Sequence, residues 1–352
     1  MERNKVTIED VANEARVSVG TVSHVLSGRV KVREKTLERV NRAIKELGFI
    51  PNFHAQGLRQ SASSIIGLCL PHLVNSFMSV LSRTFEEVST SSGYSIMHVY
   101  SRQNPEIELR RIKELLRFRI DGLIFHPSNT PRSTLDYVHE LGIPVVLIDS
   151  ANIDNRFDRV VLDNQSNMRR AVERLIQLGH RRILFVCQWE HVGVTQSRLR
   201  GLNAAKSEAA VPLSINHISY GENEAGLGAK LAAELGRRDA PTAIIASNSS
   251  QAALVIRILQ DLPTRYPQDV SLLSFDDPEW STMVSPQLSV IRQPAAESGK
   301  IAWDLMMRRI VGGKEGPRKV VLEAEIEIRE SVRALNERTE AGVKRKRRAG
   351  QG

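Results

Sequence analysis

Short apolar runs alternate with amphipathic segments along most of the chain. From residue 64 onward, continuous apolar stretches such as Ile65–Leu70 and Val145–Ile148 predict buried strands, and the segments between them carry apolar residues at helical spacing. The strands predicted from this pattern are 65–70, 94–99, 122–125, 145–148, 183–186, 215–219, 243–246, 271–274, 290–292 and 319–328. The helices predicted between them are 80–88, 106–118, 134–141, 168–178, 198–209, 226–235, 250–259 and 296–310. Such alternation is typical of parallel sheets with helices on both faces.

The alternation runs through two successive sets, which predicts an α/β body of two doubly wound parallel sheets. The first lobe is expected at about 64–162 and 292–318, and the second at about 163–291 and 319–331. Open sheets of this kind bind ligands beyond the carboxyl ends of their strands. The residues that follow each strand are therefore the candidates for a site between the lobes.

The first fifty residues have a different pattern, which is purely helical. Thr7 and Asp10 have the spacing of a capping box, Ser18 is a candidate for a second N-cap, and Gly48 is suited to end a helix. The three helices predicted are 8–16, 19–26 and 34–47. Two short helices joined by a tight turn and followed by a longer one predict an all-α helix-turn-helix domain over residues 1–51.

The second helix of such a domain enters the major groove of DNA, and residues near its N-terminus reach the base edges. Hydroxyl and imidazole groups can contact phosphates and bases there, and a valine can contact a thymine methyl group. The candidate DNA-binding residues in this part of the chain are Thr7, Ser18, Val19, Gly20, Thr21, Ser23 and His24. A three-helix scaffold that binds no DNA has the same periodicity, so spacing alone leaves both interpretations open.

Three spaced motifs separate these interpretations. Val6–Ala12, Val17–Ser23 and Gly48–Asn52 resemble the lactose-repressor/galactose-repressor (LacI/GalR) family of bacterial transcription regulators, and the resemblance is colinear from about residue 6 to residue 331. It implies a sequence-specific regulator, expected to be a repressor, that binds a near-palindromic operator in double-stranded DNA as a homodimer. It also implies a body of the type I periplasmic-binding-protein fold. That body is expected to bind a small-molecule effector, a sugar or a sugar acid, between its lobes.

Two residues of the helical domain depart from the family pattern. Arg16 stands where the family usually has glycine in the turn, so the turn is expected either to differ slightly or to gain a phosphate contact. His24 replaces an arginine that usually contacts DNA, which predicts an unusual operator preference. Because imidazole titrates near about pH 6.5, a pH-sensitive contact and an inert surface histidine both fit the sequence.

Residues 52–63 are predicted to form a hinge helix or linker. The segment is short for an isolated helix and contains Gly57, so it is expected to fold only against a partner. The resemblance implies that two such helices pair in the minor groove and that Leu58 inserts between base steps. It also implies that Ala55 packs between the two hinges and that Asn52 belongs to the DNA-binding set. An ordinary linker whose leucine packs on the body is the alternative.

Residues that follow the predicted strands supply the candidate effector site, and the family resemblance selects among them. The candidate effector-binding residues are Asn75, Phe77, Arg198, Tyr220, Asn248, Asp276 and Trp280. Asp276 matches the family's pocket carboxylate, and Arg198 matches an arginine whose fork binds hydroxyls or anions. The aromatic residues fit either a stacking face or the core. Ser249 replaces an expected aspartate, and the loss of that charge favours an anionic ligand such as a sugar acid.

The distribution of charge fits a nucleic-acid reader joined to a neutral body. The net charge is +9, and residues 1–61 hold 11 Lys/Arg against 7 Asp/Glu. Residues 338–352 hold 6 Lys/Arg against 1 acid, so the rest of the chain is neutral. The basic segment 332–352 is predicted to be disordered, either adding non-specific DNA affinity or remaining solvated.

Composition excludes several classes of protein. The 352 residues are 41% apolar and 25% charged, as in globular proteins, and no apolar run approaches the ~20 residues of a membrane span. The segment that follows Met1–Lys5 is amphipathic and unlike a secretory signal, which predicts a cytoplasmic protein. Cys69 and Cys187 lie in apolar runs and are expected to be buried, inert thiols.

Catalysis is not expected from the motifs. The chain contains no phosphate-binding loop, zinc-protease helix, nucleophile elbow or CxxC pair, so neither a cofactor nor a metal is expected. His180, just before the strand at 183–186, is interpreted as a structural residue. A solute-binding protein that serves transport and a sugar-modifying enzyme are the alternatives, and the helix-turn-helix domain argues against both.

Overall fold

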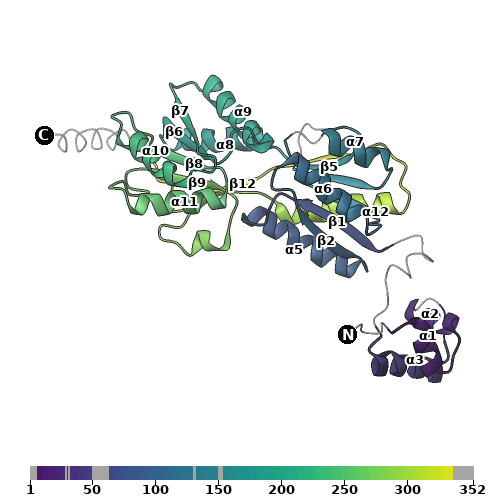
Figure 1. Ribbon diagram of the computed structural model, residues 1–352. Coiled ribbons are helices and arrows are strands. Elements are labelled where there is room, and N and C mark those ends of the chain that lie inside the picture. Colours follow the sequence, from purple (N-terminus) through teal and green to yellow (C-terminus); the bar gives the residue numbers. More distant parts are fainter. Residues whose placement is uncertain are drawn as a thin grey trace. The chain divides into compact units, whose positions relative to one another are not determined.

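The computed structural model describes residues 6–27, 30, 32–49, 63–129, 132–149 and 154–335. The chain divides into two compact units, residues 1–63 and residues 64–352. Within the described residues the smaller unit is helical, and the larger one combines two sheets with flanking helices (Figure 1).

The smaller unit is built on a compact core of branched and small apolar side chains. Its helices are α1 (Ile8–Glu14), α2 (Val19–Ser27) and α3 (Glu34–Leu47). Val11, Val22 and Val40, one from each helix, are fully buried in this core. The three predicted helices are therefore present and packed together.

The helix ends of this unit follow the predicted capping signals. The Thr7 backbone N donates to Asp10 Oδ2 at 2.8 Å, and the Asp10 backbone N donates to the Thr7 hydroxyl at 3.3 Å, which completes the capping box. Ser18 Oγ accepts from the Thr21 backbone N at 3.1 Å at the start of α2. Gly48 ends α3 with a φ of 62°, a left-handed conformation that glycine adopts without steric cost.

The first lobe of the larger unit is a six-stranded sheet in which all neighbouring strands are parallel, in the order β11-β5-β4-β3-β1-β2. Its strands are β1 (Ile65–Leu70), β2 (Ser95–Tyr100), β3 (Gly122–Phe125), β4 (Val145–Ile148), β5 (Asp158–Leu162) and β11 (Lys319–Leu322). Its helices are α5 (Ser76–Ser91), α6 (Pro105–Leu116), α7 (Arg132–Glu140) and α12 (Ala295–Ile310). The pair α5 and α12 covers one face of the sheet, and the pair α6 and α7 covers the other.

The second lobe repeats this plan with the strand order β12-β10-β9-β8-β6-β7, in which only the β10–β12 pair is antiparallel among the described strands. Its strands are β6 (Arg182–Cys187), β7 (Ser214–Ser219), β8 (Ala243–Ala246), β9 (Ser271–Phe275), β10 (Ser289–Arg292) and β12 (Glu325–Glu327). Its helices are α8 (Asn164–Gln177), α9 (Gly193–Glu208), α10 (Glu224–Gly236), α11 (Ser249–Gln260) and the short 3-10 helix η1 (Glu279–Thr282). The predicted pair of doubly wound sheets is confirmed.

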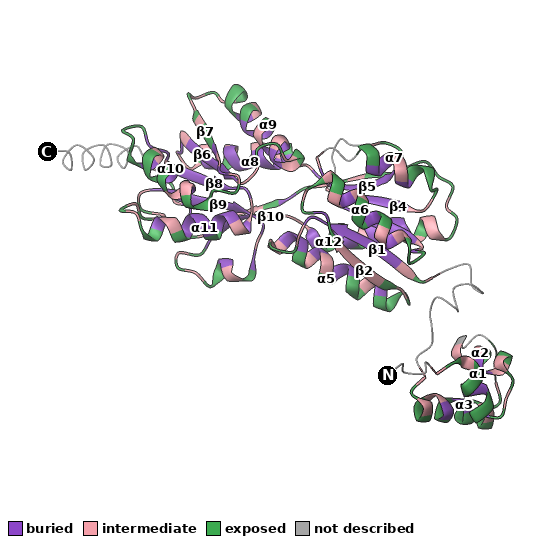
Figure 2. Cartoon of the chain, viewed as in Figure 1, coloured by how far each residue is buried: buried purple, intermediate pink, exposed green. Residues whose placement is uncertain are grey.

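Strands buried on both faces explain the continuous apolar runs of the sequence (Figure 2). In β1, Leu68 faces the cluster with α5 and α12, whereas the adjacent Cys69 faces the cluster with α6 and α7. Cys69 and Cys187 are both fully buried, and burial raises the pKa of both thiols, that of Cys187 to about 11. The expectation of buried thiols is confirmed, and thiols with raised pKa values are poor nucleophiles at neutral pH.

The chain passes between the lobes after β5, after β10 and after β11. The single strand predicted at 319–328 is wrong: β11 pairs with β5 in the first sheet, and β12 pairs with β10 in the second. The chain changes sheets at Ala324, which is buried and donates its backbone N to Asn167 Oδ1 at 3.0 Å. The second-lobe segment expected at 319–331 therefore starts only after β11, because β11 belongs to the first lobe. The first-lobe segment expected at 292–318 starts one residue too early, because β10 extends to Arg292 and belongs to the second lobe.

The prediction places the start of the disordered tail too early, at residue 332. Val332 is buried, and the Leu335 backbone N donates to the Leu178 carbonyl at 2.7 Å, so residues 332–335 pack on the second lobe. Residues 336–352 lie outside the described residues, and the prediction for them stays a prediction. No helix in the described part of the chain is long and apolar enough to cross a membrane.

Candidate functional site

The predicted reading helix α2 presents polar residues on one side. Gly20 and His24 are exposed and Thr21 and Ser23 are half-buried, whereas Val22 is fully buried in the core of the unit. The side of α2 that carries the predicted DNA contacts is therefore accessible.

Three other candidate DNA-binding residues have structural partners of their own. Val19 is half-buried against the helical core. The hydroxyls of Ser18 and Thr21 lie 3.0 Å apart and share a hydrogen bond, and the Thr7 hydroxyl donates to Asp10 Oδ2 at 2.8 Å. These hydroxyls fix the starts of α1 and α2. A phosphate oxygen only accepts, so a contact with one needs a hydroxyl hydrogen, which Thr7 already donates to Asp10 and which only one of Ser18 and Thr21 uses in their shared bond.

The turn between α1 and α2 has a left-handed backbone at its arginine. Arg16 has a φ of 51°, the left-handed region in which glycine is free of steric cost. The guanidinium of Arg39 holds this turn, since its Nε donates to the Ala15 carbonyl at 3.0 Å and its Nη2 donates to the Arg16 carbonyl at 2.8 Å. The Arg16 side chain is exposed on the surface of the unit.

The remaining candidate DNA-binding residues belong to the predicted hinge. Asn52, Ala55 and Leu58 lie outside the described residues. The minor-groove wedge stays a prediction from the sequence.

A cavity lies between the lobes of the larger unit, at the carboxyl ends of both sheets, as predicted. It has a first chamber of about 110 Å³ and a second chamber of about 250 Å³, which share Gln103, His126 and Asp149. The first chamber is lined by, among others, Asn75, Phe77, Arg198, Asn248, Asp276 and Gln293. The second chamber is lined by, among others, Asn129, Asn164, Gln196, Ser197 and Arg200. Five of the seven candidate effector-binding residues thus line the first chamber.

Arg198 lies at the wall of the first chamber, and all three of its guanidinium nitrogens donate to protein acceptors. Its Nε donates to Asn164 Oδ1 at 2.9 Å, its Nη1 to the Ser247 carbonyl, and its Nη2 to Gln293 Oε1 at 3.4 Å. The guanidinium also stacks on Phe275, 3.6 Å from the ring centroid. Burial lowers the pKa of Arg198 to about 10, so the group remains a cation at neutral pH.

Asp276 lies beside this arginine and is 3% exposed. Its φ of 68° is left-handed, its backbone N donates to the Ile291 carbonyl at 3.0 Å, and the Gln293 amide donates to its Oδ1. Burial raises the pKa of the Asp276 carboxyl, against the opposing effects of Arg198 and the Gln293 hydrogen bond. A buried, partly hydrogen-bonded carboxyl of this kind can accept hydrogen bonds from a ligand's hydroxyl groups.

Two predicted amides act as helix caps at the rim of the first chamber. Asn75 Oδ1 accepts from the Met78 backbone N at 2.9 Å at the start of α5. Asn248 Oδ1 accepts from the Ser250 and Gln251 backbone N atoms at the start of α11. Capping occupies the oxygen of each side chain, so the NH₂ group is the part that each can offer to a ligand.

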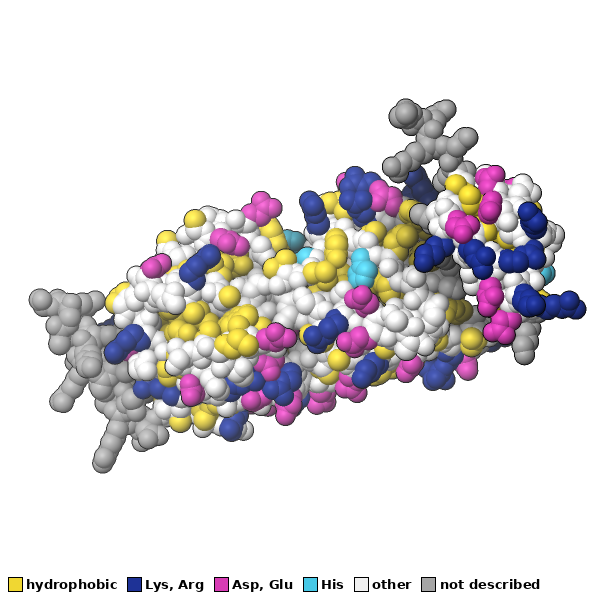
Figure 3. All heavy atoms as spheres, turned by 90° about the horizontal axis from the view of Figure 1, so that it is seen from below, with side chains coloured by type: hydrophobic (Ala, Val, Ile, Leu, Met, Phe, Trp, Pro, Cys, Tyr) yellow, Lys and Arg dark blue, Asp and Glu magenta, His cyan; other side chains and the backbone are white. Residues whose placement is uncertain are grey.

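Two candidate aromatic residues lie outside the cavity, and their expected contact with an effector is not supported by the structure. Tyr220 is buried in the core of the second lobe, where its hydroxyl accepts from Gln251 Nε2 at 3.2 Å. Trp280 lines a separate groove of about 760 Å³ between α5 and α11. Hydrophobic side chains gather on both lobes in the view of Figure 3. The sequence left open whether these residues belong to the core or to the pocket. In the structure Tyr220 belongs to the core and Trp280 lines the surface groove.

Several cavity residues were missed, although the rule used on the sequence points to them. His126, Asp149 and Gln293 directly follow β3, β4 and β10, and Gln103 comes shortly after β2. His126 Nε2 and Asp149 Oδ2 are 3.6 Å apart, and both side chains are almost fully buried. The family pattern selected other residues and so passed over these positions.

Side chains from the two lobes meet on both sides of the cavity. Asn129 of the first lobe donates its amide to the His191 carbonyl and accepts a hydrogen bond from the Gly193 backbone N. Ser249 of the second lobe accepts from the backbone N and the hydroxyl of Ser76, both at 3.3 Å. The residue that replaces the expected aspartate is therefore part of an interlobe contact and lines neither chamber.

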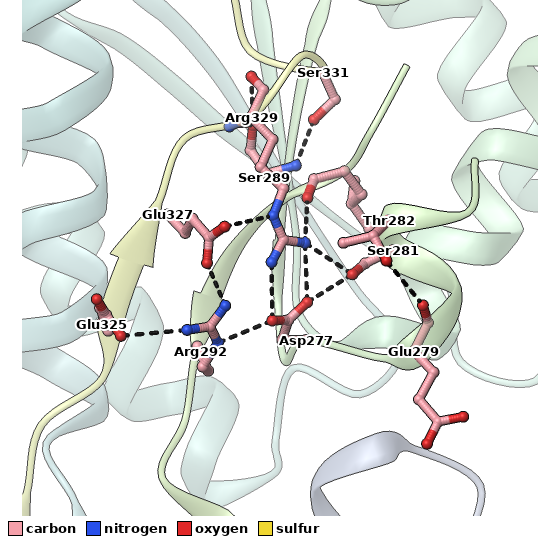
Figure 4. Close-up of polar contacts among 11 residues, drawn as sticks. Asp277, Glu279, Ser281, Thr282, Ser289, Arg292, Glu325, Glu327, Arg329 and Ser331 are labelled. Atoms are coloured by element: carbon pink, nitrogen blue, oxygen red, sulfur yellow. Dashed lines mark hydrogen bonds and ion pairs between the residues drawn. The ribbon is translucent and has the colours of Figure 1, made fainter. Parts of the chain in front are cut away.

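An ion cluster behind Asp276 joins the cavity wall to the crossing strands (Figure 4). Asp277 accepts from Arg292 Nε at 2.9 Å, from two nitrogens of Arg329 at 2.9 and 3.0 Å, and from the Ser281 hydroxyl at 2.6 Å. Arg292 and Arg329 also share Glu327 of β12. Burial pushes the pKa of Asp277 upward, but the hydrogen bonds from Arg329, Ser281 and Arg292 outweigh it and hold the pKa below its usual range.

Two family models match the chain. The model of the bacterial regulatory proteins, lacI family, matches residues 7–52, and the model of the periplasmic binding protein-like domain matches residues 172–332. Catabolite control protein A of Priestia megaterium is 32% identical over 330 residues, which are 93% of this chain and 99% of that protein. The chain belongs to the lacI family of bacterial regulatory proteins. It is accordingly a DNA-binding transcriptional regulator.

Other lacI-family proteins show the same full-length match. The ribose operon repressor of Haemophilus influenzae is 30% identical over 332 residues, which are 94% of this chain and 99% of that protein. The lac repressor dimer, solved with operator and an anti-inducer, matches with a TM-score of 0.81 at 24% identity, over 94% of this chain and all of that one. The predicted combination of a helix-turn-helix domain with a periplasmic-binding-protein-like body is confirmed.

Proposed function

We propose that this lacI-family regulator is a repressor that binds a near-palindromic operator as a homodimer and changes its operator affinity when a neutral sugar enters the cavity between the lobes. The observation that carries the proposal is the buried Asp276–Arg198 wall at the carboxyl ends of the strands, in a chain whose first domain is a helix-turn-helix. The name of the ribose operon repressor supports the sugar class.

Charge favours a neutral effector over the sugar acid also considered from the sequence. The guanidinium of Arg198 is occupied by three protein acceptors, so little of it remains to bind a carboxylate. Asp149 and Asp276 both line the first chamber and repel an anion. Hydroxyl groups, which both donate and accept, match this mixture of carboxylates and amides.

A surface groove supports the proposed homodimer. The groove is lined by Trp280, Val80 and Ala253, and also by Val74, which is 77% exposed. Met283, which directly follows η1, is equally exposed. Apolar side chains that are exposed together mark an interaction surface, and an interface on this groove would bury Val74 and Met283. A twofold dimer through this face would present two reading helices to the two halves of one operator.

The proposed response is a change in how the lobes are held together. Three crossings and the Asn129 and Ser249 contacts join the lobes, so a ligand between them biases their arrangement. The shift in operator affinity equals the effector's differential affinity for the two arrangements, typically about 1 to 3 kcal/mol. The proposal includes no catalytic step, and it places the protein in the cytoplasm with the DNA it reads.

The first test is selection of genomic DNA fragments by the purified protein at about 150 mM salt. We expect one inverted repeat to be recovered, because a dimer reads two half-sites. Operator affinity is then measured with and without a panel of neutral sugars and their acids. Recovery of unsorted DNA with a steep salt dependence would show that the basic segments bind phosphates without reading sequence.

The second test is Asp276→Asn, which keeps the shape of the side chain and removes its charge. We expect the variant to bind the selected operator within about twofold of the natural protein and to lose its response to the sugar, because a buried acceptor of the ligand is weakened. A normal response in the variant would contradict the assignment of the first chamber as the effector site.

A further inference from the structure

Two segments of the first lobe are strongly basic, although residues 62–337 together carry no net charge. Residues 110–119 hold five Lys/Arg against one acid, Glu114, and residues 308–319 hold five Lys/Arg against one acid, Glu315. The first segment ends α6 and the second ends α12, and both helices belong to the first lobe (Figure 1). The neutral total therefore conceals a local excess of positive charge.

Topology brings both segments to one edge of the first sheet. Arg117 and Arg119 lie between α6 and β3, and residues 311–318 lead from α12 into β11. Because all neighbouring strands of this sheet are parallel, the segments that lead into them lie together at the amino ends of the strands. Three strand spacings, about 14 Å, separate β3 from β11. This edge is opposite to the cavity, which lies at the carboxyl ends.

The segment between α12 and β11 is held in shape by one buried ion pair. Arg309 donates to both carboxylate oxygens of Asp158 at 2.6 and 2.9 Å, and to three backbone carbonyls of residues 313–316 at 2.6 to 3.2 Å. Asp158, the first residue of β5, also accepts from the Arg318 backbone N at 2.7 Å. The acid at the centre of the segment is thus neutralised by Arg309, which leaves the other cations of the segment on a fixed support.

The remaining cations of this edge are exposed and unpaired. No carboxylate lies within ion-pair distance of any of them among the residues that the structure describes. They are Arg117, Arg119, Arg308, Lys314, Arg318 and Lys319, which we call the amino-end face. The exposed acids of the described segments at this edge are Glu140 and Glu315, so positive charge dominates.

The chain that comes from the helix-turn-helix unit enters the larger unit at this same edge. Ser64 directly precedes β1, and its backbone N donates to Asp121 Oδ2 at 2.8 Å, two residues after Arg119. A duplex held by the helical unit is therefore tethered to the amino-end face. Tethering raises the effective concentration of one binding partner at the other, so even weak contacts contribute to affinity.

We propose that the amino-end face is a second DNA-contacting surface, which binds backbone phosphates of the duplex that flanks the operator. Exposed Lys and Arg side chains without carboxylate partners displace counterions from phosphates, and such contacts carry no sequence information. The face adds affinity to a complex whose sequence is read by α2. This inference goes beyond the proposed function and requires only that the helical unit hold a duplex.

The first test compares two duplexes in titrations of the full chain over a range of salt concentrations. One duplex ends at the selected inverted repeat, and the other extends it by about 20 base pairs on each side. We expect the longer duplex to bind at least about tenfold more tightly, with a steeper dependence on salt. The double variant Arg318→Gln, Lys319→Gln should lose most of this advantage and lower the slope of log affinity against log salt by about two for each protomer.

A double variant of the second lobe is the matched control. Lys206→Gln with Arg238→Gln removes the same charge at two exposed positions, so it should keep the preference for the longer duplex and the salt slope. Thermal unfolding of both double variants shows that the chain remains folded.

The second test is photo-crosslinking from the segment between α12 and β11. Val311 is 84% exposed there, so Val311→Cys can carry a thiol-linked photoreactive group, while the fully buried Cys69 and Cys187 stay unlabelled. We expect crosslinks to bases outside the inverted repeat. The control Gln260→Cys, at an exposed position of the second lobe, should give none.

The outcomes separate this inference from the proposed function. Equal affinity for both duplexes, with no effect of Arg318→Gln and Lys319→Gln and no crosslink from residue 311, would overturn the DNA-contacting face and leave the regulator intact. Loss of regulation in cells by this double variant, with DNA binding unchanged, would overturn it in favour of an acidic protein partner. If no inverted repeat is recovered, the same titrations on random duplexes of both lengths still test the face.

Discussion

At the scale of single residues, left-handed backbone marks both working parts of the molecule. Seven non-glycine residues have positive φ in the described part of the chain. Gln103, Asp149 and Asp276 line the cavity, and Arg16 forms the turn before the reading helix. Such conformations persist only where neighbours hold them, as Arg39 holds the turn at Arg16. Four of these seven residues thus lie in the cavity lining or in the turn before α2.

Arg16→Gly tests the turn directly. We expect the free energy of unfolding of the helical unit to rise by about 0.5 to 1 kcal/mol, because glycine adopts this φ without a steric penalty. If Arg16 contacts a phosphate, the slope of log affinity against log salt falls by about one. Hydrogen exchange in α1 and α2 of the full chain measures the first effect, and operator titrations at several salt concentrations measure the second.

Arg16→Ala is the control for this change. It removes the charge but keeps a Cβ, so it should lower the salt slope as much as Arg16→Gly without the gain in stability. Equal stabilisation by both variants would show that strain at Arg16 is not the cause.

At the scale of elements, periodicity predicted most helices and strands because each follows from one local pattern. The helix at 34–47 was placed correctly, since its apolar stripe, first turn and C-terminal glycine all agree. The strand at 319–328 was not, because its apolar pattern does not show that successive halves join different sheets. Tyr220 and Trp280 were assigned to the site for a similar reason: sequence gives their distance from a strand but not the direction in which they pack.

The segment after β12 shows how one side chain joins elements far apart in sequence. His180 is fully buried between α8 and β6, its Nε2 lies 3.0 Å from the Arg333 carbonyl, and its Nδ1 lies 3.0 Å from the Thr242 hydroxyl. A carbonyl only accepts, so Nε2 carries the proton. Nδ1 of the neutral ring faces the Thr242 hydroxyl, which is also within hydrogen-bond distance, 3.2 Å, of the Arg182 carbonyl. Burial lowers the pKa of His180 to about 4. The prediction of a structural histidine thus has a physical basis.

This pKa predicts a pH dependence of stability. Because the folded-state pKa lies below the unfolded value of about 6.5, the unfolded chain binds a proton more readily, and stability falls as the pH drops from about 6.5 to 4. The loss reaches about 3 kcal/mol at the low end and does not grow below it. We expect His180→Gln to flatten this part of the curve in urea titrations.

His217→Gln is the control for the pH experiment. His217 is partly exposed and pairs with the exposed Glu190, so its removal should leave the slope between about pH 4 and 6.5 nearly unchanged. A natural protein whose stability is flat over this range would show that His180 is not buried in neutral form.

At the scale of the whole molecule, the Asp277 cluster connects the cavity wall at Asp276 to two of the three interlobe crossings. Asp276 and Gln293 face the cavity, while their neighbours Asp277 and Arg292 pair behind it. Arg292 ends β10, which leads into α12, and Glu327 lies in β12, which follows the last crossing. We therefore expect a change in how Asp276 is held to reach, through these ion pairs, the strands that join the lobes.

Asp277→Asn tests this connection. The amide cannot pair with two guanidinium groups, so we expect the free energy of unfolding to fall by about 2 to 3 kcal/mol and hydrogen exchange to quicken in β10 and η1. We also expect the effector to change operator affinity less than in the natural protein, because its contact with Asp276 is no longer fixed to the crossing strands. Glu325→Gln removes only a 3.4 Å contact between a largely exposed carboxylate and Arg292, so it should cost less than about 0.5 kcal/mol and keep the full response. A full response in Asp277→Asn, despite the loss of stability, would mean that the cluster holds the lobe together without coupling the effector to the operator.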